Sequence, residues 1–149
     1  MATQQRVVRA ERIVAADAET IFELIADPAR QPEWDGNDNL AEAPPGQRVH
    51  AVGECFDTTL TTGAVRRNHV VEFDETRRIA WRPSEVGAPP PGHLWRWELT
   101  PVDGGTLVTH TYDWTELDDP AREVRARATT SDKLQKSVDA LADVAERVR

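Results

Sequence analysis

His110 and Tyr112 are the polar side chains whose types and spacing best suit chemistry. They stand two residues apart in a run, 106–115, that alternates as a β-strand does, so both lie on one face. A histidine with a pKa near neutrality can move protons, and a tyrosine can hydrogen-bond a carbonyl or phenol oxygen. The pair is therefore a candidate acid/base site. The alternative, which we favour, is a hydrogen-bonded histidine inside a mostly apolar cavity.

Tryptophan is unusually frequent among the aromatic residues, with five Trp beside three Phe and one Tyr. Strand alternation places Trp95 and Trp97 on one face of the run 93–101, and Trp114 on the face of His110 and Tyr112. Trp81 shares a face with Ile79 on the preceding run. Each aromatic side chain buries about 150–250 Å², so these tryptophans together would form an unusually large exposed patch. They must be covered by core, ligand or partner.

Two neighbouring runs carry polar residues whose orientation stays open. Along 64–73, Arg67 and His69 face inward unless a one-residue bulge near Val70 reverses the set. Along 48–61, Glu54 shares the face of Phe56, together with Val52, Thr58 and Leu60. An inward Glu54 near Arg67 would form either a structural ion pair or a site that orients a ligand.

The elements that must position these residues are mostly strands. A strand over 5–15 is followed by a helix that begins after Asp17 and stops at Asp27-Pro28, and by a short turn over 29–33. Short Gly- and Pro-rich connections then separate strands that must be antiparallel neighbours. We predict these strands at residues 40–43, 48–61, 64–73, 78–83, 93–101 and 106–115.

The C-terminal part of the chain is predicted to be one long amphipathic helix. Asp119 is a suitable N-cap, and Pro120 suits the first helical position. Poor helix formers at 129–132 favour a kink or a fresh start near Ser131. The apolar stripe comprises Leu134, Val138, Leu141, Ala145 and Val148.

These elements predict an α+β domain spanning residues 1–149, because the sheet must bury one face against the helix. Gly53 and Gly63 are placed to let the long strands curl. The helix stripe is narrow and aliphatic, so a large curved sheet facing it leaves room for a cavity.

Several segments of the sequence are similar to those of a known family. They are 11–34, ERIVAADAETIFELIADPARQPEW; 77–82, RRIAWR; 94–101, LWRWELTP; and 104–114, GGTLVTHTYDW. Over nearly the whole chain, the sequence resembles polyketide cyclase/dehydrase-like proteins of the START/Bet v 1-like (SRPBCC) superfamily. The resemblance implies a helix-grip fold: a curved antiparallel seven-stranded sheet around the long C-terminal helix, with two short helices after the first strand.

The resemblance also implies a pocket for a small hydrophobic ligand, polyketide-, lipid- or aromatic-like, between sheet and helix. Trp34 is then expected near its mouth. Members of the superfamily include cyclases, for which His110 and Tyr112 would suit aldol cyclisation or dehydration without a cofactor. The expected ligand-binding residues are Trp34, Phe56, His69, Trp81, Trp95, Trp97, His110, Tyr112, Trp114, Leu134 and Val138.

Composition and motifs exclude other classes of function. The formal net charge of −8 argues against a nucleic-acid or anionic-membrane binder. The single cysteine, Cys55, cannot form an internal disulfide, and without an apolar leader or membrane span the chain is expected to be cytoplasmic, as a monomer or homodimer. The sequence has no metal-binding motif, phosphate loop or Gly-x-Ser-x-Gly phrase, so we expect no metal and no cofactor.

A second functional class stays open. Some superfamily relatives act at ribosomes or in toxin-antitoxin settings rather than on metabolites. Arg66, Arg78, Arg82 and Arg96 lie on the outer faces of their strands and could form a surface for such a partner. Glu72 and Glu98 share that surface, so salt bridges on a solvated face explain it equally well.

Overall fold

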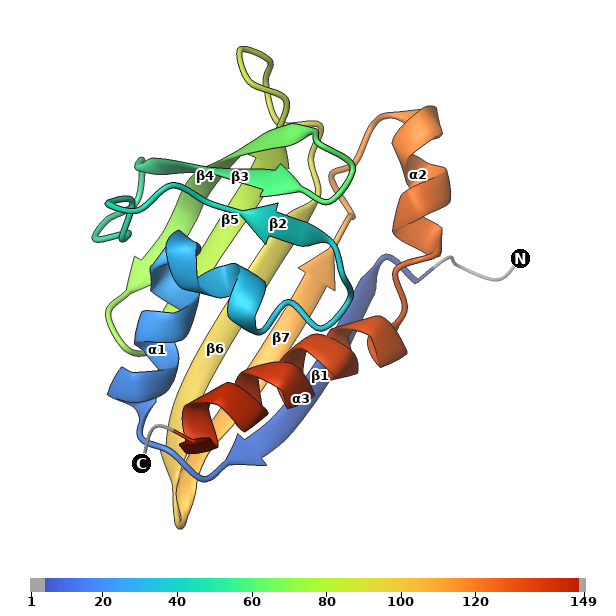
Figure 1. The fold of residues 1–149 in the computed structure, drawn as a ribbon. Helices are drawn as coiled ribbons and strands as arrows, with labels where there is room; N and C mark the ends of the chain where they lie inside the picture. The colour runs from blue at the N-terminus through green and yellow to red at the C-terminus, as the bar shows by residue number, and fades with distance from the viewer. Residues whose placement is uncertain (1–4, 148–149) are drawn as a thin grey trace.

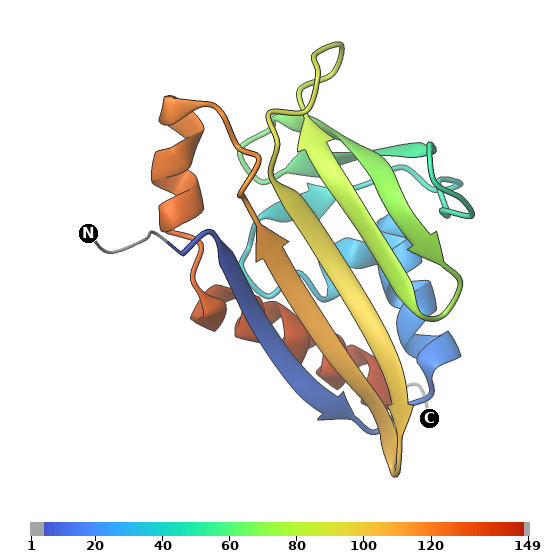
Figure 2. The same ribbon diagram turned by 180° about the vertical axis from the view of Figure 1, so that it is seen from behind.

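A curved sheet of seven antiparallel strands forms the framework of the protein, as seen in the computed structural model, which describes residues 5–147 (Figures 1 and 2). The spatial order is β1-β7-β6-β5-β4-β3-β2. The helices α1 and α3 cover one face, and Figure 2 shows the other face without a helix over it. The strands are β1 Val7–Val14, β2 Leu40–Glu42, β3 Cys55–Leu60, β4 Val65–Asp74, β5 Arg78–Ser84, β6 Leu94–Val102 and β7 Gly105–Asp113.

Two short helices follow β1. The helix α1, Ala18–Ala26, is capped by Asp17, whose carboxylate accepts the amide proton of Thr20 at 2.8 Å. The 3₁₀ helix η1, Pro28–Glu33, begins at the proline that stops α1. α1 turns Ile21, Phe22, Leu24 and Ile25 into the core.

The C-terminal region forms two helices instead of one. Helix α2, Pro120–Arg127, starts at the expected cap, Asp119, and helix α3, Ser131–Arg147, starts afresh at Ser131. The carbonyl of Thr130 accepts the amide protons of Lys133 and Leu134, which fixes the new start. The stripe of α3 is buried as expected at Leu134, Val138, Leu141 and Ala145, and Val148 lies outside the described residues.

The strand predicted over 48–61 is shorter than expected. It begins at Cys55, because Gly53 has a φ of 95° and the carboxylate of Glu54 accepts the amide protons of His50 and Ala51. Gly63 lies in the β3–β4 turn, so neither glycine curves a strand. The irregularity in the long strands is a bulge in β4, where the register with β5 shifts between Val70 and Glu72.

The helix-grip architecture predicted from the sequence is confirmed: the curved sheet holds α3 against its concave face, with α1 beside it (Figure 1). α2 lies beyond the start of α3 and buries only Ala126. No helix within residues 5–147 is long and apolar enough to cross a membrane.

Candidate functional site

A cavity of about 380 Å³ lies between the concave face of the sheet and the helices. Its volume falls within the range of about 300–1,000 Å³ that is usual for small-molecule sites. The sheet contributes residues from β2 to β7, α3 contributes Leu134 and Ser137, and α2 contributes Arg122 and Arg125. The cavity therefore has the position that the sequence predicts, with α2 as an additional wall.

Two cross-strand aromatic pairs form the sheet side of the cavity. Trp95 pairs with Tyr112 and Trp97 pairs with His110 across β6 and β7. The ring of His110 stacks on Trp97 with centroids 3.7 Å apart and planes at 15°, and on Trp95 at 5.5 Å and 13°. Such pairs stabilise a sheet and fix the orientation of each ring.

Trp34, at the end of η1, closes the wall from the opposite side. Its indole N–H donates to the carbonyl of Leu24 at 2.7 Å, and its ring meets Trp97 edge to face at 5.2 Å. The side chain is 5% exposed. Trp34 therefore forms an inner wall, whereas the sequence placed it at the mouth.

His110 is neutral at physiological pH. Full burial lowers its pKa to about 3, although a backbone hydrogen bond from the ring to Arg96 opposes this shift. Nδ1 lies 3.1 Å from the carbonyl oxygen of Arg96 and must donate to it, which leaves Nε2 as the acceptor. An acid/base role would need a pKa near neutrality, and the pKa is lower here because the ring stacks on two indoles and is removed from water.

Tyr112 keeps its proton, because burial raises the pKa of the phenol to about 12. Tyr112 lines the cavity, and its hydroxyl makes no hydrogen bond to another residue in the described part of the chain. It can therefore donate a hydrogen bond to a bound molecule.

His93 also lines the cavity and was missed by the sequence interpretation. Its ring meets Tyr112 at 6.0 Å, and its Nδ1 is buried without a hydrogen-bond partner among residues 5–147. Burial lowers its pKa to about 4, and the nearby charges of Arg122, Arg125 and Arg66 add to the effect. Strand alternation places His93 on the same face as Trp95 and Trp97, and this pattern could have identified it from the sequence.

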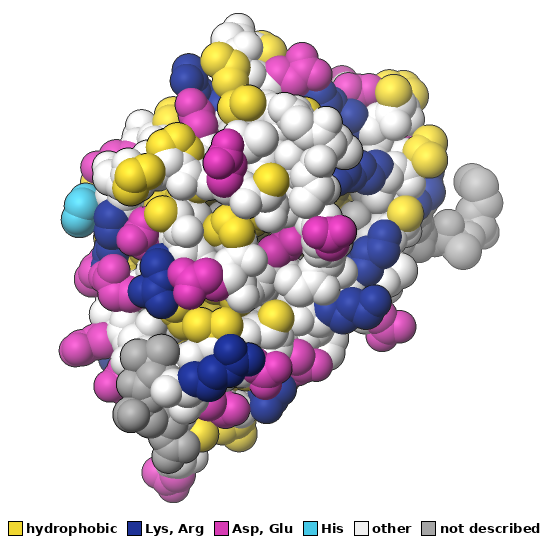
Figure 3. All heavy atoms as spheres, in the orientation of Figure 1, with side chains coloured by type: hydrophobic (Ala, Val, Ile, Leu, Met, Phe, Trp, Pro, Cys, Tyr) yellow, Lys and Arg dark blue, Asp and Glu magenta, His cyan; other side chains and the backbone are white. Residues whose placement is uncertain are grey.

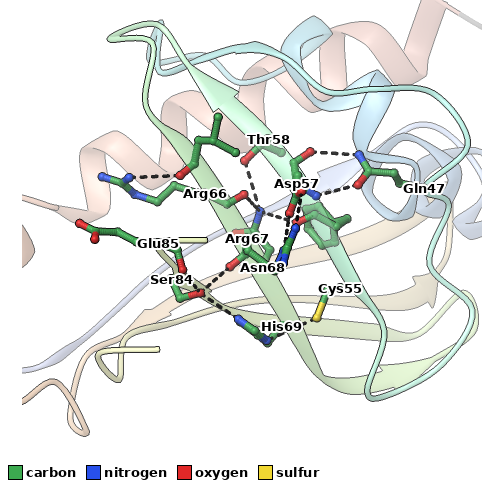
Figure 4. A network of polar contacts seen from close by, with 12 residues as sticks. Gln47, Cys55, Asp57, Thr58, Arg66, Arg67, Asn68, His69, Ser84 and Glu85 are labelled. Carbon is green, nitrogen blue, oxygen red and sulfur yellow. Dashed lines mark hydrogen bonds and ion pairs between the residues drawn. The ribbon is translucent and has the colours of Figure 1, made fainter. Parts of the chain in front are cut away.

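The inner face of β4 carries Arg66, Asn68 and Val70, whereas the sequence allowed Arg67 and His69 to face inward. The bulge after Val70 produces this reversal. Asn68 donates to the hydroxyl of Thr58 and to the carbonyl of Phe56, both at 3.2 Å (Figure 4).

The residues on the other side of β4 form a separate polar network, shown in Figure 4. Arg67 forms a bidentate pair with Asp57 at 2.9 and 3.0 Å, and so it does not form the contact with Glu54 that the sequence left open. His69 lies between the Sγ of Cys55, at 3.4 Å from Nδ1, and the hydroxyl of Ser84, at 2.9 Å from Nε2.

The structure brings together most, but not all, of the residues expected at the ligand site. The cavity is lined by Trp34, Trp81, Trp95, Trp97, His110, Tyr112 and Leu134. Four others lie elsewhere: Phe56 and Val138 are packed in the core, Trp114 stands beyond the end of β7, and His69 is in the network outside. The expectation that these four line the cavity was wrong.

Trp114 is excluded from the cavity because β7 ends at Asp113, where strand alternation stops. The guanidinium groups of Arg6 and Arg127 lie over its ring, 4.4 and 5.8 Å from the centroid. Phe56 instead meets the cavity residue Trp81 edge to face at 5.2 Å. Phe56 therefore contacts a residue of the cavity wall without lining the cavity itself.

The rim of the cavity contains residues that the sequence interpretation did not single out. The loop after η1 supplies Asp35, Asn37 and Asn39, and α3 supplies Lys133. Gly36 has a φ of 77°, and a Cβ there would lie 2.6 Å from the carbonyl oxygen of Lys136. Glycine thus lets this loop pack directly on α3. No group of three or more metal-ligating side chains occurs in the part of the chain that the structure describes.

Known proteins share this fold. Protein MLL2253 from Mesorhizobium loti has a TM-score of 0.72 at 18% identity, with 97% of this chain and 99% of that one covered. The Polyketide_cyc-like protein Cgl2372 from Corynebacterium glutamicum has a TM-score of 0.67 at 15% identity, covering 97% and 94% of the two chains. At these identities the likeness concerns the fold.

Sequence comparison adds a relative and a family. The uncharacterized protein Rv0088 from Mycobacterium tuberculosis is 31% identical over 105 residues, which are 68% of this chain but only 44% of that protein. The model of the family "Polyketide cyclase / dehydrase and lipid transport" matches residues 5–146. The chain therefore belongs to the polyketide cyclase/dehydrase and lipid transport family.

Proposed function

We propose that this protein binds a small hydrophobic molecule, polyketide-, lipid- or aromatic-like, in the cavity between the sheet and α3. The observation that carries the proposal is the aromatic wall of a cavity of about 380 Å³. Rigid, broad rings that are held in place before binding lose little conformational freedom when a ligand arrives. Trp34 is held by its hydrogen bond to Leu24, and His110 by its bond to Arg96.

Catalysis is a second candidate function, and the residues of the site support it less well than they support ligand binding. His110, with a pKa of about 3, is a poor proton carrier at neutral pH, because an efficient acid or base has a pKa near the working pH. Tyr112 stays protonated and is suited to hold a carbonyl or phenol oxygen. A cyclase or dehydratase reaction here would depend on ligand positioning and on Tyr112 rather than on His110.

The charges on the outer face of the sheet favour ligand binding over a role as an interaction protein. Arg96 forms a bidentate pair with Glu72 at 2.6 and 2.9 Å, and Arg78 pairs with Glu98 at 3.3 Å. Arg66 lines the cavity rather than the outer face. Arg78 and Arg96 are thus neutralised by neighbouring carboxylates, whereas Arg82 donates to the carbonyl of Gly92.

A titration with the neutral fluorophore N-phenyl-1-naphthylamine, followed by quenching of tryptophan emission, tests the proposal. We expect saturable quenching with one site per chain. The variant Leu60→Trp places an indole ring in the cavity lining and should abolish saturable quenching. The control Val52→Trp adds the same ring at a position that is 58% exposed and should leave the quenching saturable. Absence of saturation in the folded wild-type protein would refute the proposal.

A further inference from the structure

The charge of the cavity lining is opposite to that of the chain. The sequence has 26 acidic residues and 18 Lys and Arg, whereas the lining contains Arg66, Arg122, Arg125 and Lys133 against one carboxylate, Asp35. Figure 3 shows several dark blue side chains over α2 and the start of α3. A basic rim on an acidic protein indicates a local requirement for positive charge.

Two of the charged lining residues already have partners. The carboxylate of Asp35 accepts the amide protons of Asn39 and Leu40, the latter at 3.0 Å. Arg122 is paired with Asp119 at 3.0 Å and with Glu85 at 3.2 Å. These contacts hold the rim loop and α2 in place.

The other three cations have no carboxylate within salt-bridge distance among residues 5–147. Arg125 donates to the side-chain oxygen of Asn39 at 3.2 Å. Among the described residues, the guanidinium of Arg66 hydrogen-bonds only to the carbonyl of its neighbour Val65, at 3.4 Å. Arg66, Arg125 and Lys133 come from β4, α2 and α3. Because three separate elements supply them, they are not simply the solvated face of one helix.

Their positive charge reaches the aromatic part of the cavity. Arg122, Arg125 and Arg66 act with burial to lower the pKa of His93, and Arg125 opposes the burial that raises the pKa of Tyr112. An anionic group at the rim would be attracted by this field.

We propose that the ligand is an amphipathic anion, with an aromatic or other apolar body against the Trp95 and Trp97 wall and a carboxylate or sulfonate between Arg66, Arg125 and Lys133. This inference rests on the proposed function and narrows it to one class of ligand. The rim cations supply charge-assisted hydrogen bonds that a neutral ligand of the same shape cannot form.

Two probes that share one apolar body test the inference. 8-Anilinonaphthalene-1-sulfonate carries a sulfonate, and N-phenyl-1-naphthylamine lacks it. The double variant Arg125→Gln/Lys133→Gln should weaken binding of the sulfonate about tenfold and that of the neutral probe less than twofold. The matched control, Arg9→Gln/Arg77→Gln, removes the same charge at exposed positions away from the rim and should change neither.

Each other outcome is decisive. Equal weakening of sulfonate binding by both double variants would reduce the effect to net charge and overturn the inference. An unchanged affinity of the rim variant for the sulfonate probe would also overturn the inference. In that case, saturable binding of the neutral probe would still support the proposed function. Failure of both probes to bind the wild-type protein would instead refute the proposed function. Near-ultraviolet circular dichroism verifies folding, and Arg66→Gln provides an independent rim variant.

Discussion

The imidazole of His110 stacks on the indole of Trp97 with ring centres 3.7 Å apart, while its Nδ1 donates to the carbonyl of Arg96. This relationship decides the character of the site. Stacking and burial keep the imidazole neutral, so the residue that the sequence marks as the best proton carrier acts mainly as a wall of the cavity.

The buried His110 should make the protein less stable in acid. Its pKa is lowered in the folded state, so the unfolded chain binds more protons between about pH 3 and 6.5, and stability falls as the pH falls through that window. Between pH 7 and pH 5 this loss amounts to about 2 kcal/mol. We expect urea unfolding of His110→Phe to show a pH dependence that is smaller by this amount, with the exposed His50→Phe as control. Equal pH dependence in wild type and His110→Phe would contradict the assignment.

Replacing Trp34 by Phe should destabilise the fold and loosen the cavity wall. The change keeps an aromatic ring but removes the N–H that donates to the carbonyl of Leu24 at 2.7 Å. Losing a buried hydrogen bond and part of a packed ring costs about 1–3 kcal/mol. Urea denaturation measures the loss, and a change below about 0.5 kcal/mol would show that the hydrogen bond contributes little.

Arg6 should hold α2 in position. Its guanidinium lies over Trp114, donates to the carbonyls of Trp114 and Leu117 at 3.4 Å, and pairs with Glu123 of α2 at 3.3 Å. In Arg6→Gln we expect faster amide hydrogen exchange in α2 with unchanged exchange in α3. The variant Arg9→Gln is the matched control. Unchanged exchange in α2 would show that other contacts suffice.

The hydroxyl of Tyr112 should recognise oxygen on a ligand. The phenol stays protonated at neutral pH, so it can donate to a carbonyl or phenol oxygen. Tyr112→Phe should weaken binding of 2-naphthol about fivefold, the effect of about 1 kcal/mol, and leave naphthalene binding nearly unchanged. Displacement of N-phenyl-1-naphthylamine measures both affinities. Equal effects on the two ligands would mean that the hydroxyl does not contact them.

Regular alternation made the β6 and β7 side of the cavity predictable. The pairing of β6 with β7 contains no bulge. The four cavity residues on these strands therefore lie on the face that strand alternation predicts: Trp95, Trp97, His110 and Tyr112. Trp114 does not, because it follows the last residue of β7, and the end of a strand depends on tertiary contacts rather than on local pattern.

The β4 side and the rim were beyond sequence reasoning for different reasons. Val70 and Val71 are equally apolar, so the pattern could not decide which one faces inward. The bulge between Val70 and Glu72 sets the direction of Arg66 and His69. The rim cations come from three elements far apart in the chain. Only the folded arrangement brings them around one cavity.

The most direct test of ligand binding follows the indole N–H resonances in a ¹H–¹⁵N NMR titration with N-phenyl-1-naphthylamine. Trp34, Trp81, Trp95 and Trp97 line the cavity, whereas Trp114 is covered by Arg6 and Arg127 and serves as an internal control. We predict that the signals of the cavity tryptophans shift in a saturable manner while that of Trp114 stays in place. Absence of shifts, or an equal shift of all five signals, would contradict a ligand-binding cavity at this site.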